Sequence, residues 1–409
     1  MKKSIIEKAF SQGKGIVRLA PAWVPRSFCR PGKRIKLHPK DYYILGLERG
    51  GIDERWLAST TPADNGPGTP TDEGLSYILA DTDREEQVLL KDAVEHLKGE
   101  LIGWSIWEKY HCWPVFSKFF DNMGPLPHHI HHRDTHAARV GQKGKPEMYF
   151  FPSQLNNHGG EFPFSFFGFN PEIEKEQVKK CLQDFSKGDN RILDLSRCYK
   201  LTLDTGWDVP PGVMHAPGSL CTYEPQFASD VYAMFQSVLT GGQCVPFDLL
   251  WKDTPKEETG NFDYLLSIID WELNIDPDFH KNRFMPPVPV CDPEEMKKEG
   301  YMEEWICYKC SNVCAKRLTI LPNRMVTVRD GAAYGFILLQ GHGRCGVWNI
   351  ETPTLIRYGQ PTHDEFFVGE AAARKGIVFH NPSTVEPMVL LKHFAENPDL
   401  SVLNEGFLQ

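Results

Sequence analysis

The sequence has no long apolar run, no dense block of lysine and arginine, and no excess of positive charge. No apolar stretch approaches the roughly 18 to 20 residues that cross a bilayer, so we expect no membrane partner. Acidic residues number 54 against 45 lysines and arginines, which gives a formal net charge of -9. A chain without a basic patch has little to neutralise a phosphate backbone, so we expect no nucleic-acid partner either.

A sequence pattern for export is also missing. Residues 1–8 include lysines, but the sustained apolar core of a secretory signal does not follow them. We therefore expect a cytoplasmic protein. In that compartment the 11 cysteines are expected to be reduced and mostly buried thiols.

The composition, 41% hydrophobic and 24% charged, is that of a globular chain that can bury a core, and 409 residues leave room for two or three domains. Helical patterns lie around residues 84–99 and 263–271, whereas short apolar segments separated by Gly and Pro dominate elsewhere. The predicted fold class is mainly β, with two barrels and helical additions. The predicted domains are an N-terminal extension packing on the first barrel (1–100), a metal-binding barrel (101–248), a helical insert and linker (249–305) and a second, smaller barrel (306–409).

The densest chemical signal is the run of histidines that starts at His128. On a strand, side chains alternate faces, so His129 and His131 would point to one side while His128 and His132 point to the other. Two imidazoles would then converge on one cavity. Glu147, on the next predicted strand, could add a carboxylate oxygen, and this donor set suits a divalent transition metal.

A fourth candidate ligand lies far downstream. Pro210, Pro211 and Gly212 predict a tight turn that presents His215 at the start of a strand. With His129, His131 and Glu147, it would complete three imidazoles and one carboxylate around one divalent metal, with a position open for water or a substrate oxygen. A histidine-rich strand can also be only a polar edge, but the spacing and the downstream order favour a metal site.

The succession His-x-His, later Glu, then Pro-x-Gly-x-x-His resembles the cupins, and its flanks resemble the type I mannose-6-phosphate isomerase family. The resemblance runs from about residue 40 to residue 240, and it is looser in the second barrel. The segments that carry it are residues 51–56, 116–121, 126–131, 144–148, 209–216 and 223–226. It implies two cupin (jelly-roll) barrels and a metal-dependent aldose–ketose isomerase that acts on a sugar or sugar phosphate through an enediol.

The resemblance also implies roles for residues around the metal. Lys145 and Glu224 are the candidates for proton transfer, and Lys118 and Lys145 for substrate binding. Each lysine could instead be a solvated residue at a turn or strand edge. The expected cofactor is one divalent ion, most simply zinc, with manganese or iron as alternatives.

Two positions depart from the family pattern. His129 stands where the family usually has Gln, which suits zinc and would also admit iron or manganese. After Ser229 and Asp230 the family has an Arg near the substrate, whereas Met234 lies near that place here. A missing guanidinium removes a strong partner for phosphate, so the sequence leaves open whether the sugar is phosphorylated.

Other functions stay open at this point. Three histidines and one glutamate also suit an iron- or manganese-dependent cupin oxygenase, and the missing Arg suits a non-catalytic carbohydrate-binding or regulatory cupin. An exposed barrel edge is compatible with a homodimer. Two weaker metal patterns involve zinc at Cys307, Cys310 and Cys314, and a decayed site at His363, Glu370 and His380.

Overall fold

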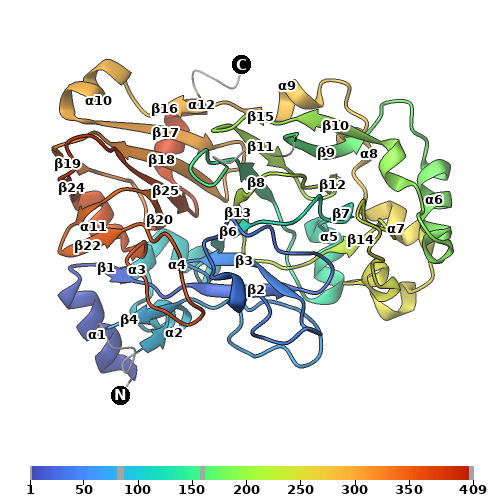
Figure 1. Ribbon diagram of the computed structural model, residues 1–409, viewed down its shortest axis with the longest axis horizontal. Coiled ribbons are helices and arrows are strands. Elements are labelled where there is room, and N and C mark those ends of the chain that lie inside the picture. The colour runs from blue at the N-terminus through green and yellow to red at the C-terminus, as the bar shows by residue number, and fades with distance from the viewer. Residues whose placement is uncertain (1, 81–86, 157–161, 405–409) are drawn as a thin grey trace.

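The computed structural model describes residues 2–80, 87–156 and 162–404. Over these residues the strands form two large sheets, two smaller sheets and one two-stranded pair. Each large sheet lies with a smaller one, and the two assemblies stand side by side in Figure 1, the C-terminal one in orange and red at the left.

The first barrel is built around the segment that contains the histidine run. Its large sheet has the order β15 (Phe284–Met285), β11 (Gly206–Val209), β8 (Glu147–Phe150), β13 (Thr222–Phe227), β6 (Val115–Phe120), β3 (Gly51–Leu57), β2 (Ala22–Arg26). Its small sheet has the order β10 (Ser196–Lys200), β9 (Phe164–Phe169), β12 (His215–Ala216), β7 (His129–Ile130), β14 (Ala233–Met234).

The second barrel contains most of the C-terminal strands. Its large sheet has the order β1 (Ile16–Arg18), β23 (Glu365–Val368), β20 (Tyr334–Gln340), β25 (Met388–Phe394), β18 (Cys314–Ile320), β17 (Tyr301–Cys307), β16 (Val288–Pro289). Its small sheet has the order β19 (Arg324–Val328), β24 (Ile377–Asn381), β21 (His342–Cys345), β22 (Trp348–Glu351). The separate pair is β4 (Tyr77–Leu79) with β5 (Gln87–Leu89).

Helices surround these sheets. They are α1 (Lys2–Gln12), α2 (Leu90–Leu97), α3 (Gly99–Ile102), α4 (Trp104–Tyr110), α5 (Asp134–Ala137), α6 (Lys175–Gln183), α7 (Phe262–Ile268), α8 (Trp271–Asn274), α9 (Phe279–Arg283), α10 (Pro293–Glu299), α11 (Glu370–Lys375) and α12 (Ser401–Asn404). Local sequence sets their ends: Asn261 accepts hydrogen bonds from the first turn of α7, and Gly300 ends α10 with a positive φ of 100°. Among the described residues, none of these helices has the length and apolar character to cross a bilayer.

The helical prediction for residues 84–99 is partly wrong. Gln87–Leu89 forms β5 and pairs with β4, so the helix begins only at Leu90; residues 84–86 lie outside the described residues. Backbone hydrogen bonds pair these three residues with β4, so they do not form a first helical turn. The prediction for residues 263–271 corresponds to α7 and the start of α8, separated because Asp270 caps α8.

The large sheet of the first barrel is buried on both faces. Lys118 of β6 and Tyr149 of β8 line a cavity inside the barrel, whereas their neighbours Phe119 and Met148 join an apolar core that includes strands of the second barrel. Because side chains alternate along a strand, one face of this sheet lines the cavity and the other face packs against the second barrel. Arg55 of β3 also crosses this boundary, with ion pairs of 2.8 and 3.0 Å to Asp364 and Glu365.

Strands from outside the predicted barrel segments complete both large sheets. β1, in the N-terminal region, pairs with β23 of the second barrel, while β2 and β3 join the first barrel. In the region predicted as insert and linker, β15 pairs with β11 and β16 pairs with β17. Both segments thus contribute strands to both barrels, and the domain boundaries themselves stay a prediction.

Candidate metal centre and substrate pocket

Three histidines meet on the small sheet of the first barrel. His129 of β7 and His215 of β12 are directly paired across the two strands, and His131 follows β7 on the same side. One ring nitrogen from each lies within 4.8 Å of the others, and this is the one group of potential metal ligands of its kind found among the described residues. All three side chains are buried. Distant segments thus converge as the histidine spacing predicts.

The hydrogen bonds of the rings fix which nitrogen is free. Nδ1 of His129 lies 2.7 Å from the carbonyl oxygen of Pro127, Nδ1 of His131 2.8 Å from that of Val231, and Nδ1 of His215 2.9 Å from that of Val213. A carbonyl oxygen can only accept, so each Nδ1 carries the proton. Each Nε2 therefore presents a lone pair, which is the form that binds a metal.

Glu147 faces two of these lone pairs. Its Oε2 lies 3.0 Å from Nε2 of His131, and its Oε1 lies 3.1 Å from Nε2 of His215. Among the described residues, Nε2 of His215 is buried without a hydrogen-bond partner, whereas Nζ of Lys145 lies 3.0 Å from both Oε2 of Glu147 and Nε2 of His131. A buried acceptor without a donor is unfavourable, and a cation beside Nε2 of His215 and Glu147 would remove that cost. The residues present therefore fit the divalent ion that the sequence predicts.

Burial and neighbouring charges keep the ligands in metal-binding form. Burial lowers the pKa of His131 to about 4, and it also lowers the pKa of His129 well below its usual range. Burial alone would raise the pKa of Glu147, but His131 and Lys145 hold it well below its usual range. At neutral pH the imidazoles of His129 and His131 are thus neutral and the carboxylate is charged, as coordination requires.

The predicted catalytic and substrate-binding residues line the same cavity. Nζ of Lys145 lies 3.0 Å from Oε2 of Glu147 and 3.6 Å from Oε1 of Glu224. Nζ of Lys118 lies 3.3 Å from the same oxygen of Glu224, its partner directly across β6 and β13. Neither lysine is a solvated surface residue, because both are buried. Burial and repulsion from Glu147 raise the pKa of Glu224 to about 8, although both lysines oppose this shift.

Sequence reasoning did not find three further polar residues of the cavity. Arg26 of β2 makes ion pairs of 3.2 Å each with Glu54 of β3 and with Asp230. Glu54 lies within the quoted segment 51–56, which could have pointed to it, whereas nothing in the sequence singles out Arg26. Met234 also lines the cavity.

The cavity measures about 30 Å³. Small-molecule sites usually enclose on the order of 300 to 1,000 Å³, so a sugar can enter only if lining side chains move. Its lining residues are Arg26, Phe28, Glu54, Lys118, Leu126, His129, His131, Lys145, Tyr149, Glu224, Asp230, Tyr232 and Met234.

The remaining histidines of the run lie elsewhere. His128 points away from the metal cluster and contacts Ser196, and its ring packs edge-on near Phe169. His132 is fully buried, so neither residue is the surface group that the sequence allowed. Both instead support the wall behind the ligands.

The cysteine pattern forms no metal cluster in the described chain. Cys307 and Cys314 are fully buried in the apolar core, where their thiols face the backbone carbonyls of Tyr149 and Ala395. Cys307 and Cys314 are therefore small, buried packing residues, as expected for most of the cysteines.

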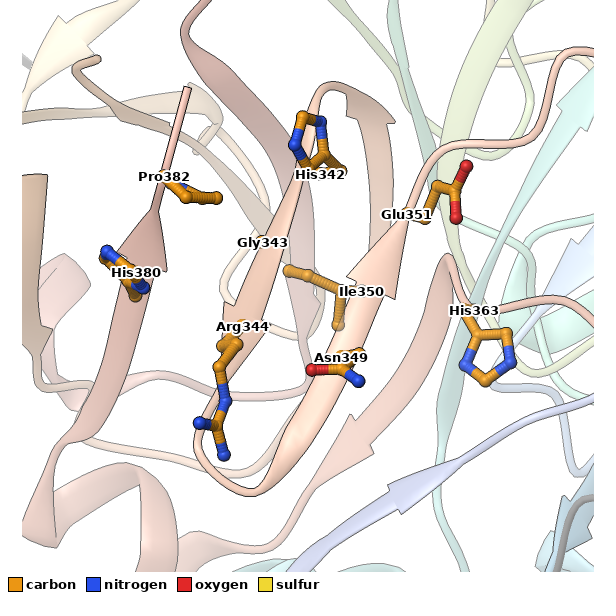
Figure 2. Close-up of a pocket in the computed structure, with 9 residues that line it drawn as sticks. All are labelled: His342, Gly343, Arg344, Asn349, Ile350, Glu351, His363, His380 and Pro382. Carbon is orange, nitrogen blue, oxygen red and sulfur yellow. The ribbon is translucent and has the colours of Figure 1, made fainter. Parts of the chain in front are cut away.

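A larger groove, of about 780 Å³, lies on the small sheet of the second barrel (Figure 2). His363 and His380 lie on opposite sides of it, and Glu370 is outside it, at the start of α11. Within the described residues these three side chains form no metal group. Residues 341–346 form part of a hairpin, because they contain β21 and the turn to β22.

Comparison with solved structures finds the same overall fold in several isomerases. The chain is similar to mannose 6-phosphate isomerase from Bacillus subtilis, at 14% identity and a TM-score of 0.61, over 93% of this chain and 99% of that one. It is also similar to a variant of phosphomannose isomerase from Salmonella typhimurium, at 11% identity and a TM-score of 0.60, over 93% and 100%. A third is a mannose 6-phosphate isomerase bound with zinc and yttrium, at 11% identity and a TM-score of 0.59, over 93% and 100%.

These likenesses confirm the predicted fold class and the resemblance at the level of the fold. The chain has the fold of the mannose-6-phosphate isomerases. No protein-family model matches the sequence, and no curated protein matches it.

Proposed function

We propose that the protein is a metal-dependent aldose–ketose isomerase. The observation that carries this proposal is the convergence of three Nε2 lone pairs and the Glu147 carboxylate beside a buried cavity, which His129, His131, Lys145 and Glu224 line. A site for one cation thus lies beside groups that can transfer protons. The fold of the similar isomerases supports the same assignment.

The proposed ligands are His129, His131, Glu147 and His215. A divalent ion held there supplies Lewis acidity to substrate oxygens, which acidifies the carbon beside the carbonyl. Zinc suits three imidazoles and one carboxylate, and manganese or iron would also be accepted.

Glu224 is proposed to move the proton. In the aldose-to-ketose direction it takes a proton from C2 and returns it to C1, while a proton passes from the C2 hydroxyl to the former carbonyl oxygen on C1. Lys145 and Lys118, which both face Oε1 of Glu224, would orient the sugar and compensate the negative charge that develops.

The test is proton NMR in heavy water of metal-loaded protein with a panel of aldoses, ketoses and their phosphates. Isomerised product, or deuterium at C1 or C2, is the expected result, because the proton bound to the enzyme exchanges with solvent. Oxygen consumption by ferrous protein without such exchange would favour a cupin oxygenase. Sugar binding without either reaction would favour a binding protein.

A further inference from the structure

A row of alternating charge follows the large sheet of the first barrel, and all of its members except Glu147 line the cavity. We name it the charge row, and its members, in spatial order, are Asp230, Arg26, Glu54, Lys118, Glu224, Lys145 and Glu147. From Arg26 to Glu147 it follows the neighbouring strands β2, β3, β6, β13 and β8 of the large sheet. Every member is at most 8% exposed in the described structure.

Each cation of the charge row lies between two carboxylates. Arg26 bridges Asp230 and Glu54 at 3.2 Å each, and Lys118 bridges Glu54 and Glu224 at 3.4 and 3.3 Å. Lys145 lies between Glu224 and Glu147 at 3.6 and 3.0 Å. Before any metal binds, each of these three cations therefore has at least one carboxylate partner besides Glu224.

A phosphate group is a poor match for such a row. It carries a charge of about −1.5 to −2 at neutral pH, and it would have to displace buried carboxylates from their cations or lie against them. The other lining residues include Phe28, Leu126, Tyr232 and Met234, which offer no further positive charge to a phosphate. The small volume of the cavity also disfavours a phosphorylated sugar, because the phosphate group makes the ligand larger.

A neutral sugar matches the row well. Each hydroxyl both donates and accepts hydrogen bonds, and the row alternates carboxylate acceptors with ammonium or guanidinium donors. Successive hydroxyls of one carbon chain can therefore each find a complementary partner along the row.

We propose that the substrate is a neutral, unphosphorylated sugar, read by the charge row from Glu147 to Arg26. This inference rests on the proposed isomerase function and adds its substrate class. It also gives Arg26 a role in specificity. The Arg26 guanidinium, whose charge is compensated by Asp230 and Glu54, can donate a hydrogen bond to a sugar hydroxyl.

The experiment compares matched pairs, mannose with mannose 6-phosphate and fructose with fructose 6-phosphate, by deuterium exchange in metal-loaded protein. We expect the free sugar to have the higher kcat/KM in each pair, by about tenfold or more. A preference for the phosphorylated sugar overturns the inference and leaves the isomerase standing. Exchange with no sugar overturns the proposed function instead.

The Glu54→Gln variant tests the physical cause. The amide oxygen can still accept from Nε1 of Trp56, but Arg26 and Lys118 each lose a compensating charge. We expect the preference for the free sugar to fall by about tenfold, given the strength of charge interactions at this separation. Glu351→Gln, an exposed residue of the second-barrel groove, makes the same charge change and should leave the preference unaltered.

Two further measurements judge the inference even if Glu54→Gln does not fold or no sugar reacts. Inorganic phosphate should not compete with the free sugar in the wild-type protein, and effective competition would contradict the compensated row. Calorimetric titration of the metal-loaded protein with the same sugar pairs should show tighter binding of the free sugar. Tighter binding of the phosphorylated sugar, or of neither, overturns the inference.

Discussion

At the residue scale, each candidate ligand histidine donates its Nδ1 proton to a backbone carbonyl. The carbonyl of Pro127 orients His129 and that of Val213 orients His215, each from a residue two positions earlier in the chain. This local geometry fixes the ring before any metal binds. The His-x-His spacing predicted the shared face, but it could not predict these carbonyl partners, because they depend on the backbone path into each short strand.

The His215→Ala variant should bind metal at least about 100-fold more weakly, since a primary ligand is expected to matter no less than the residues that orient one. Metal titration and metal content after dialysis measure the effect. His363→Ala, in the second-barrel groove, is the matched control. Wild-type metal affinity in His215→Ala would contradict the assignment.

The Glu224→Gln variant should lose about 10²- to 10⁴-fold in kcat, because the amide has nearly the same shape but cannot carry the proton. Metal content and the unfolding transition should stay close to wild type, since Glu224 is not among the proposed ligands. Activity is measured as deuterium exchange with the best sugar. A variant with full activity would remove Glu224 from the proton-transfer role.

At the element scale, the pocket depends on pairings between strands that lie far apart in the chain. Residues 144–148 and 209–216 were predictable as local patterns, and so were Lys145, Glu147 and His215. Arg26 was not, because its place in the site requires β2 to pair with β3 and β3 with β6. Such non-local pairing leaves no local periodicity to detect.

The ion pairs of Arg55 connect β3 to the second barrel. Arg55→Met leaves Asp364 and Glu365 buried without their cation, so it should lower the free energy of unfolding by about 3 to 5 kcal/mol. Arg344→Met, at an exposed position of β21, should change it by less than about 0.5 kcal/mol. Urea denaturation compares the two, and equal effects would contradict a stabilising role for the Arg55 pairs.

The same contact predicts a pH dependence. Burial raises the pKa of Glu365 from 4.5 to about 7, although Arg55 opposes the shift. The folded state therefore keeps a proton that the unfolded state releases, so this contribution to stability is present below pH 4.5 and is lost as the pH rises through about 7.

Glu365→Gln removes this titration. The free energy of unfolding of wild type, relative to that of the variant, should fall between about pH 5 and about pH 8, by at most about 1.4 kcal/mol per pH unit. Urea denaturation at both pH values measures the difference. A difference that is constant or rises with pH would show that Glu365 does not titrate as described.

At the scale of the whole molecule, one apolar core joins the two barrels. Phe119 and Met148 of the first barrel belong to the same buried cluster as Phe336 and Leu391 of the second. The sequence predicted two barrels, but it did not predict that they share a core. The strands concerned alternate between polar side chains that face the cavity and apolar side chains that face the second barrel, as Lys118 and Phe119 do. Barrels that share a core are expected to unfold together.

Thermal unfolding followed by far-ultraviolet circular dichroism and by tryptophan fluorescence should therefore show coincident transitions. Arg55→Met should move both signals to lower temperature by the same amount. Two separated transitions would contradict a shared core and support independent domains.

The most direct test of the central claim is sugar deuterium exchange in one protein preparation before chelation, after chelation and after metal is restored. The account predicts exchange at C1 or C2 in the first and third states and almost none in the second, with one divalent ion per chain restoring activity. Exchange that persists in metal-free protein, or that is absent from metal-replete protein with every sugar, would contradict it.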